Sequence, residues 1–124
     1  MTVTVTIKTQ FEAAVHLYDY DGACGNTHGH TYQVEVTFGN HDATCDMVVD
    51  YYIARTWVNQ IIQSLDHQYL NKLEAFSTIS PTTENIARWL NKQISGIIND
   101  ENVYIKRISL AENNHFSVQY ESDT

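Results

Sequence analysis

Apolar and polar residues alternate strictly in two stretches of the chain. Residues 2–8 alternate threonine with valine or isoleucine, and residues 31–38 place a large apolar side chain at every second position. Because successive side chains of a strand point to opposite faces, both stretches predict strands with one apolar face. The same parity, extended backward from Tyr32, places His28 and His30 on the apolar face. A short apolar run over residues 47–49 predicts another, buried strand.

Two stretches in the middle of the chain repeat apolar residues every three or four positions, as an amphipathic helix requires. The first follows Asp50 and continues to about Leu65. The second begins near Ser80-Pro81, where serine suits the N-cap and proline the first helical position, and it ends at Asn99-Asp100. The predicted apolar stripes are Ile53, Trp57, Ile61 and Leu65, with Val58 and Ile62 beside them, and then Ile86, Leu90, Ile94 and Ile97.

Two further strands are predicted near the end of the chain, over residues 103–111 and 116–120, with Asn113-Asn114 as the turn between them. The order of strands, two helices and strands is typical of an α+β domain, with both helices on one face of an antiparallel sheet. At 124 residues the chain is expected to form a single domain over residues 1–124. Open sheet edges favour oligomerisation.

Charge and composition narrow the function classes. The net charge of −8 argues against nucleic acid or an anionic membrane as the main partner, because both require clustered Lys and Arg. No apolar run approaches the roughly 20 residues that cross a bilayer, and the N-terminus lacks the pattern of a signal peptide. The two cysteines are too few for a disulfide framework. A cytoplasmic protein with free thiols is therefore expected.

The densest group of chemically versatile side chains is the segment Cys24-Gly25-Asn26-Thr27-His28-Gly29-His30. Two histidines one residue apart on a strand share a face and can bind one metal ion. Zinc accepts imidazole nitrogen readily, and its catalytic sites have three protein ligands. His16 is the nearest candidate upstream for the third. Cys24 is either a ligand in a closed structural site, or a nucleophile or base beside the metal, where a cation favours the thiolate.

Three other places carry polar groups that packing does not explain. Asp66-His67 follows the first predicted helix, and a carboxylate beside an imidazole can fix its tautomer or raise its basicity. Glu112 closes the strand that precedes the last turn. Thr82-Thr83-Glu84 puts amides and hydroxyls at a helix N-terminus, where an anion or a polar ring edge can bind.

Together these stretches resemble the 6-pyruvoyltetrahydropterin synthase / 6-carboxytetrahydropterin synthase family. The spacing of Cys24 from His28-Gly29-His30 is similar to that of the bacterial branch of the queuosine pathway. The matching stretches cover nearly the whole chain in the family's order: 24–36, 47–51, 65–71, 81–85 and the strand ending in Glu112.

The resemblance implies a tunnelling fold, in which subunits join their sheets into a barrel, commonly as a homohexamer of two trimers with active sites at subunit interfaces. It implies one Zn²⁺ per subunit on His16, His28 and His30. The substrate would be 7,8-dihydroneopterin triphosphate, whose pterin ring Glu112 anchors with help from Thr82 and Thr83. Cys24 would abstract the proton, with His67 as its relay partner and Asp66 orienting His67.

The reaction implied for this branch is a lyase reaction that releases triphosphate and acetaldehyde and leaves 6-carboxy-5,6,7,8-tetrahydropterin. The alternatives are a triphosphate lyase that forms 6-pyruvoyltetrahydropterin and a non-catalytic relative that only binds pterins. Three details differ from the family. The loop from His16 to Cys24 is short, Asn113 follows Glu112 where a threonine is common, and one extra residue separates Phe11 from His16. An inserted residue turns a strand side chain to the opposite face, so a β-bulge is needed to bring His16 to the metal.

Overall fold

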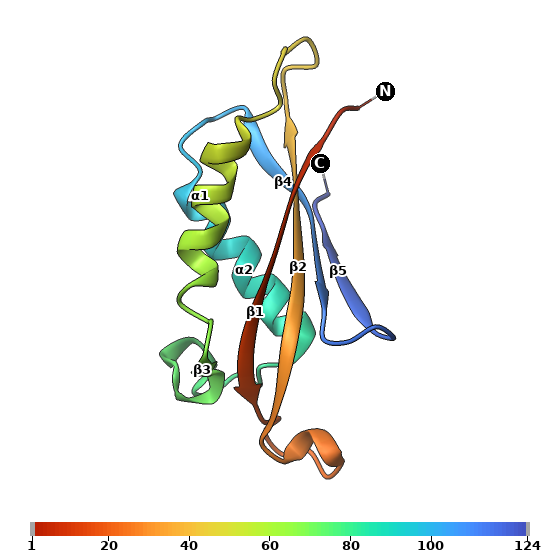
Figure 1. Ribbon diagram of the computed structural model, residues 1–124, viewed down its shortest axis with the longest axis vertical. Helices are drawn as coiled ribbons and strands as arrows, with labels where there is room; N and C mark the ends of the chain where they lie inside the picture. Colours follow the sequence, from red (N-terminus) through yellow and green to blue (C-terminus); the bar gives the residue numbers. More distant parts are fainter. Residues whose placement is uncertain (1, 124) are drawn as a thin grey trace.

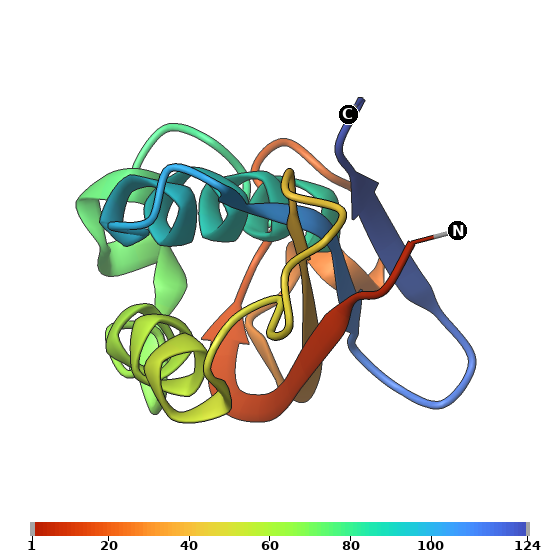
Figure 2. The same ribbon diagram turned by 90° about the horizontal axis from the view of Figure 1, so that it is seen from above.

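The computed structural model describes residues 2–123 and shows one mixed, five-stranded sheet with two helices on one of its faces (Figures 1 and 2). The strand order is β3-β1-β2-β4-β5, and every neighbouring pair is antiparallel except the short parallel pair of β1 and β3. The predicted α+β class is thereby confirmed. The elements are β1 (Val5–Val15), β2 (His28–Asn40), α1 (Tyr51–Ile62), β3 (Gln68–Tyr69), α2 (Thr83–Ile97), β4 (Val103–Ala111) and β5 (Ser117–Glu121).

The first strand is longer than its threonine-rich start indicates. β1 begins at Val5 and continues to Val15, because Phe11, Ala13 and Val15 extend the apolar face and are buried against the helices. It pairs with β2 in one unbroken register, in which Val15 lies opposite His28. The outward face of the same pair is polar, and Gln33 donates a hydrogen bond to Gln10 there (3.0 Å, Nε2 to Oε1). The long β1–β2 pair therefore leads directly to the histidine segment at its end.

A β-bulge in the pairing of β4 with β2 reverses the alternation of β4. The register shifts between Thr37 and Phe38, which oppose Arg107 and Ile105. Val103 and Ile105 are buried before the shift, and Ile108 and Leu110 are buried after it, although the two pairs have opposite parity. The extra residue restores the apolar face. It also places Glu112, which follows Leu110 by two residues, at the helix-covered face.

Helix α1 begins where the sequence predicts but turns a slightly different face to the core. Asp50 is its N-cap, accepting hydrogen bonds from the amides of Tyr52 (2.8 Å) and Ile53 (3.2 Å). Ile53 itself is 51% exposed, so the predicted stripe was wrong at that position. The helix ends at Ile62, short of Leu65, and its buried residues are Ala54, Trp57, Val58 and Ile62.

Helix α2 begins two residues later than predicted. Thr82, not Ser80, is the N-cap, and its hydroxyl accepts a hydrogen bond from the amide of Asn85 (3.1 Å). The hydroxyl of Ser80 instead accepts one from the amide of Tyr18 (2.8 Å), which fastens the loop after β1 to the start of α2. The buried stripe of Ile86, Leu90 and Ile94 matches the prediction, with Ala87 in addition.

The apolar run over residues 47–49 is not a strand. Val48 and Val49 are buried, but Met47 is 60% exposed and the segment is a bend that pairs with no strand. The side-chain amide of Asn40 donates to the carbonyl of Val48 instead (3.0 Å). The apolar run therefore reflects the burial of two side chains and does not require the backbone pairing of a strand.

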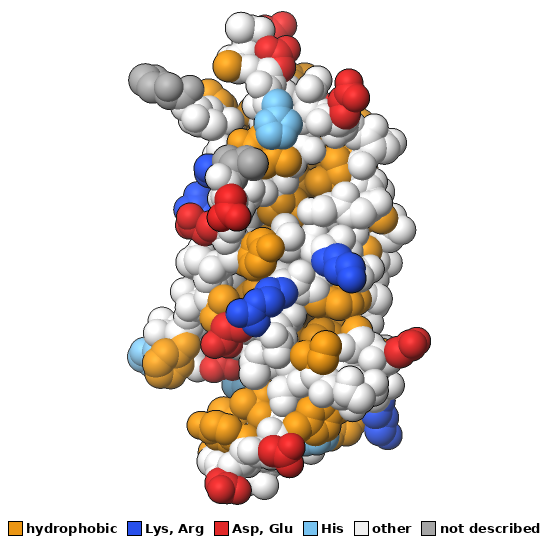
Figure 3. All heavy atoms as spheres, turned by 180° about the vertical axis from the view of Figure 1, so that it is seen from behind, with side chains coloured by type: hydrophobic (Ala, Val, Ile, Leu, Met, Phe, Trp, Pro, Cys, Tyr) orange, Lys and Arg blue, Asp and Glu red, His pale blue; other side chains and the backbone are white. Residues whose placement is uncertain are grey.

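Among residues 2–123, neither helix has the length and apolar character needed to span a bilayer. The face seen in Figure 3 carries basic side chains scattered among acidic ones and apolar patches.

Candidate active site

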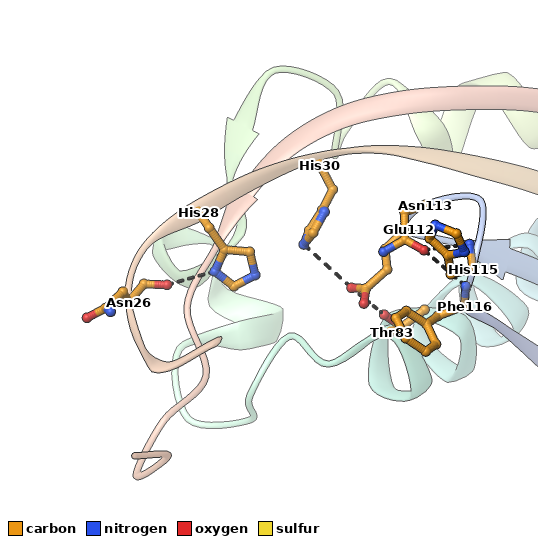
Figure 4. Close-up of polar contacts among 8 residues, drawn as sticks. All are labelled: Asn26, His28, His30, Thr83, Glu112, Asn113, His115 and Phe116. Atoms are coloured by element: carbon orange, nitrogen blue, oxygen red, sulfur yellow. Dashed lines mark hydrogen bonds and ion pairs between the residues drawn. The ribbon is translucent and has the colours of Figure 1, made fainter. Parts of the chain in front are cut away.

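Polar side chains from three elements meet at the end of the sheet where α2 begins. His30 of β2 and Thr83 of α2 both contact the carboxylate of Glu112, which directly follows β4 (Figure 4). His30 Nε2 lies 3.5 Å from Glu112 Oε2, and the hydroxyl of Thr83 donates to the same oxygen at 3.3 Å. With Cys24 and His28 these residues are called the helix-side cluster below.

His28 and His30 lie on the same face of β2, as the alternation predicts. Their rings are 4.8 Å apart between centroids and nearly perpendicular (85°). The Nδ1 atom of His28 is 2.7 Å from the carbonyl oxygen of Asn26, which can only accept, so the hydrogen bond fixes the proton on Nδ1. The lone pair of His28 Nε2 is then free to bind a metal ion, and the bond to a carbonyl is the usual support for such a ligand.

His16 lies just beyond the end of β1, and no bulge brings it there, since the register of β1 with β2 is regular. The side-chain amide of Asn71 holds its backbone on both sides, accepting from the amide (2.9 Å) and donating to the carbonyl (2.8 Å). The hydroxyl of Tyr69 joins His16 Nδ1 (2.5 Å) to the hydroxyl of Thr27 (3.2 Å). His16 is thus tied to the segment next to His28.

Across residues 2–123, no three His, Cys, Asp or Glu side chains stand close enough together to hold a metal ion. His28 and His30 are paired, while the ring of His16 packs against Tyr18 and Tyr69. The assignment of a metal to the three histidines therefore stays a prediction.

Cys24 lies exposed in a single 3-10 turn, Ala23–Gly25, within the loop between β1 and β2. The amide of Leu17 donates to its carbonyl at 2.9 Å, which closes the loop. Gly25 permits the turn, because a Cβ atom there would lie 2.0 Å from the carbonyl oxygen of Tyr20. The loop thus presents a free thiol beside the histidine strand.

Tyr32 lies under the helix-side cluster and is fully buried. Its ring stacks on Phe11 (4.8 Å between centroids) and meets His30 edge-on (5.5 Å). Among the described residues, Tyr32 Oη is the buried side-chain polar atom that has no hydrogen-bond partner. Burial raises the pKa of Tyr32, and the nearby charges of Glu112 and Cys24 raise it further. The hydroxyl stays protonated at neutral pH and can donate.

A second polar group lies on the opposite, outward face of the sheet at the β1–β3 edge. His67 stands between two carboxylates, with Nδ1 3.1 Å from Asp66 Oδ1 and Nε2 3.3 Å from Glu12 Oε2. Its backbone is left-handed (φ 59°), and its amide donates to the carbonyl of Glu12 (2.6 Å). The backbone amide of Glu12 donates to Asp66 and, with the charge of His67, lowers the pKa of Asp66. Glu12, Asp66 and His67 are called the edge cluster below.

The structure therefore divides the predicted site residues into two groups. It joins His30, Glu112 and Thr83, and it pairs Asp66 with His67. No hydrogen bond or ion pair within residues 2–123 links Cys24 to His67. Thr82 is occupied in capping α2.

Sequence reasoning missed four residues around these groups. Alternation along β1 could have placed Glu12 on the outward face, and alternation along β2 marks Tyr32 as a strand residue without showing that its hydroxyl lacks a partner. Nothing local marks the roles of Tyr69 and Asn71, because both act on residues more than fifty positions away.

Comparison with known proteins agrees with the geometry. The family model described as 6-pyruvoyl tetrahydropterin synthase matches residues 4–123. The chain belongs to this family. It is 32% identical over 123 residues to dihydroneopterin monophosphate aldolase of Pyrococcus furiosus, covering 98% of this chain and 99% of that one. It is 31% identical to 6-carboxy-5,6,7,8-tetrahydropterin synthase of a Synechocystis species, covering 64% and 65% of the two chains.

A solved structure of 6-pyruvoyl tetrahydropterin synthase from Caenorhabditis elegans superposes with a TM-score of 0.87 at 25% identity, covering 99% of this chain and 97% of that one. The predicted tunnelling fold is thereby confirmed. The tetrahydropterin synthases of the family are lyases, so the chain is an enzyme of the lyase class.

Proposed function

We propose that this lyase converts 7,8-dihydroneopterin triphosphate and one water molecule to 6-carboxy-5,6,7,8-tetrahydropterin, acetaldehyde and triphosphate, as a cytoplasmic enzyme of queuosine (7-deazapurine) biosynthesis. The observation that carries the proposal is that His30 and Thr83 both contact the carboxylate of Glu112, next to the loop that holds Cys24. This arrangement offers an acceptor for a polar ring edge beside a thiol and two imidazoles. Two free cysteines agree with a reducing compartment.

Glu112 is the proposed anchor of the pterin ring. A carboxylate can accept two parallel hydrogen bonds, which match the amino group and ring N–H of a pterin. Its side chain is 29% exposed, so a ligand can reach it. Thr83 already donates to one carboxylate oxygen and holds it in place. Thr82 has its hydroxyl hydrogen left for a ligand, because its oxygen accepts from the amide of Asn85.

Cys24 is the proposed base that removes a proton from the substrate side chain. A thiol is a base only as thiolate, so a partner must take up its proton. His67, paired with Asp66, has the chemistry of that partner, but it lies on the outward face of the sheet. We infer that a second copy supplies it, in a homohexamer of two trimers with sites between subunits. Within residues 2–123 the sheet ends at β3 and at β5, and these two edges leave room for such contacts.

His16, His28 and His30 are the proposed ligands of one Zn²⁺ per subunit. The donor set fits, because neutral imidazoles are ordinary zinc ligands and His28 already has its Nε2 lone pair free. His16 would have to approach His28 and His30 more closely than it does in the described residues. The hydroxyl of Tyr69 contacts its Nδ1, which leaves Nε2 for the metal. A bound zinc ion supplies Lewis acidity, which makes a neighbouring hydroxyl or C–H group more acidic.

A second candidate function is an aldolase reaction on dihydroneopterin monophosphate. The match to the Pyrococcus furiosus aldolase favours it, because the match spans nearly all of both chains. The same parts serve both reactions: an anchored ring and a base acting on the side-chain hydroxyls. The aldolase would split one carbon–carbon bond and release a phosphorylated two-carbon aldehyde, while a 6-pyruvoyl-forming enzyme would release triphosphate without any aldehyde.

Product analysis with two substrates separates these functions. The purified, metal-loaded protein is incubated with dihydroneopterin triphosphate and, separately, with the monophosphate. Acetaldehyde and triphosphate from the first substrate support the proposal. Release of a phosphorylated two-carbon aldehyde from the monophosphate, without turnover of the triphosphate, contradicts the proposal and indicates the aldolase reaction. Triphosphate release without acetaldehyde indicates the 6-pyruvoyl-forming reaction.

A further inference from the structure

Two side chains from the segment after α1 hold His16, and each holds a different part of it. The side-chain amide of Asn71 bonds to the backbone of His16 on both sides, at the N–H (2.9 Å) and at the carbonyl (2.8 Å). The hydroxyl of Tyr69 instead contacts the ring, at Nδ1 (2.5 Å). Asn71 therefore fixes the backbone of His16, whereas Tyr69 decides which ring nitrogen is left for another partner.

The contact with Tyr69 is not needed to fasten the loop that follows β1. Asn71 already holds the backbone of His16, and the amide of Tyr18 donates to the hydroxyl of Ser80 (2.8 Å). Both rings of the contact, those of His16 and Tyr69, belong to half-buried residues. One neutral hydrogen bond between such groups contributes little net stability. The orientation of the imidazole is what the phenol adds.

The phenol links the ring of His16 to the segment that leads into β2. Tyr69 Oη lies 2.5 Å from His16 Nδ1 and 3.2 Å from the hydroxyl oxygen of Thr27. A phenol has one proton, so it donates to one of these neighbours and accepts from the other. When the proton points to Thr27, the phenol oxygen accepts from Nδ1–H of His16. The Nε2 atom of a neutral His16 then keeps its lone pair.

His28 shows the same arrangement with the direction already decided. The carbonyl of Asn26 can only accept, which places the proton of His28 on Nδ1 and the lone pair on Nε2. Two ligands of one metal ion both need such a lone pair, and a partner on the other ring nitrogen is the usual way to secure it. The opposite direction of the phenol would put the proton of a neutral His16 on Nε2 and block that nitrogen as a ligand.

We propose that Tyr69 is a positioning residue for the metal site: its hydroxyl donates to Thr27, accepts from His16 Nδ1–H, and so holds His16 in the tautomer that binds Zn²⁺ through Nε2. The inference rests on the proposed function, because it takes His16 as a zinc ligand. Tyr69 acts through His16. It follows His67 by two residues, so one short segment supports both the metal ligand and the edge cluster.

The first test is the zinc affinity of the full chain, measured by competition with a chromophoric chelator. Loss of an outer-sphere partner lowers metal affinity by about 10–100-fold, and Tyr69→Phe is expected to fall in this range. Tyr18→Phe is the matched control, because the ring of Tyr18 also packs on His16 (5.1 Å between centroids) while its hydroxyl donates to the carbonyl of Phe76 (2.7 Å). Both variants lose one phenol hydrogen bond and should melt slightly earlier, but only Tyr69→Phe should lose zinc affinity.

The second test reads the tautomer of His16 in the full chain after zinc has been removed. Long-range proton–nitrogen NMR correlations distinguish Nδ1–H from Nε2–H, and the spectra are recorded at mildly alkaline pH, where histidine is ordinarily neutral. The wild type is expected to carry the proton on Nδ1, and Tyr69→Phe to lose this preference. A wild-type ring with its proton on Nε2 would overturn the inference.

A double-mutant cycle shows whether Tyr69 acts through His16. In the His16→Ala background, Tyr69→Phe should cause no further loss of zinc affinity. An equal loss in both backgrounds, or unchanged or tighter zinc binding by Tyr69→Phe alone, would overturn the inference. Should Tyr69→Phe fail to fold, Thr27→Val replaces it, because it removes the acceptor of the phenol proton and should weaken zinc binding several-fold. Unchanged binding by that variant would then overturn the inference.

The same measurements separate this inference from the proposed function. A wild-type protein that binds no zinc would refute the proposed ligand set, and the inference with it. A wild-type protein that binds zinc with the expected dependence on Tyr69, but turns over neither pterin phosphate, would refute the proposed reaction and leave the role of Tyr69 supported.

Discussion

The helix-side cluster and the edge cluster hold the same kinds of side chain, imidazole beside carboxylate, in opposite surroundings. In the first, the side chains of His30 and Glu112 are 21% and 29% exposed, and they lie on the face covered by the helices. In the second, those of His67 and Glu12 are 72% and 57% exposed, on the outward face. Ion pairs as exposed as the second contribute little to stability. Stability of the single chain therefore does not explain the edge cluster, whereas the proposed contact with a second copy does.

The two clusters also differ in how fully they are paired. His67 has a carboxylate beside each ring nitrogen, so residues of the same chain already fix the orientation of its ring. The helix-side cluster retains a free nitrogen on His28 and a thiol on Cys24, and the hydroxyl of Tyr32 beneath it has no partner among the described residues. A site that is to bind a ligand needs such free groups. The comparison is consistent with the proposed roles, ligand binding by the helix-side cluster and proton relay by the edge cluster.

The largest expected effect is the loss of turnover when Cys24 or His67 is removed, and it also tests whether the two residues come from different subunits. Cys24→Ala and His67→Ala should each lower kcat by about 10²–10⁴-fold, the usual contribution of a general acid or base. If each site takes Cys24 from one copy and His67 from another, co-expression of both variants should restore about one quarter of the sites, since half of the copies carry each residue. Initial rates of aldehyde release measure this.

Cys45→Ala is the control, because Cys45 is the other free thiol and packs against the core. It should keep wild-type turnover. Co-expressed variants that assemble normally but stay inactive would show that Cys24 and His67 do not complement each other across an interface.

Loss of metal is the next expected effect. His16→Ala should weaken Zn²⁺ binding by more than the roughly 100-fold that loss of an outer-sphere partner causes, because a direct ligand is removed. Metal content after dialysis against a chelator measures it. His41→Ala is the control, since His41 stacks on Tyr104 outside either cluster. Full zinc content in the His16→Ala variant would mean that His16 is not the third ligand.

Glu112→Gln tests the anchor of the ring. A hydrogen bond to a charged group contributes about 1.5–3 kcal/mol, so the affinity for 2-amino-4-oxopteridine should fall by about 10–100-fold. Glu121→Gln is the control, since Glu121 of β5 pairs with Arg107 of β4 (3.9 Å) outside both clusters. Equal affinity of the Glu112→Gln variant and the wild type in isothermal titration would show that Glu112 does not anchor the ring.

The smallest expected effect is the contribution of Asp66 in the edge cluster to the unfolding free energy of the protein at acid pH. The pKa of Asp66 is lowered by the amide of Glu12 and by His67, so its folded value lies below its unfolded one. Its contribution is present above the unfolded pKa and is lost as the pH falls through the folded pKa. The unfolding free energies of wild type and Asp66→Asn should therefore converge as urea denaturation is repeated from about pH 6 down to about pH 2.

Asp42→Asn is the matched control, because hydrogen bonds from Thr44 lower the pKa of Asp42 in the same direction. Both variants should show the convergence, but only Asp66→Asn should lose turnover. A difference between wild type and Asp66→Asn that widens toward acid pH would contradict the sign of the shift.

Local signals in the sequence determined the elements and most of the chemistry. Alternation indicated β2 and the shared face of His28 and His30, Asp50 marked the start of α1, and the spacing of motifs indicated the family. These features depend on neighbours within a few residues, which is why they can be read along the chain. The same reasoning misplaced the cap of α2, because Ser80 and Thr82 are equally good caps locally and the contact of Ser80 with Tyr18 comes from about sixty residues away.

Only the tertiary structure decided which polar groups face each other. The bulge in β4 brings Glu112 to the helix-covered face, and the turn just before β3 places His67 on the outward one. Asn71 and Tyr69 hold His16 without a bulge in β1. The missing partner of Tyr32 Oη is likewise a property of the packed interior. A strand pattern states that a side chain is buried, but whether its polar atom is satisfied depends on atoms from distant segments that only folding brings within bonding range.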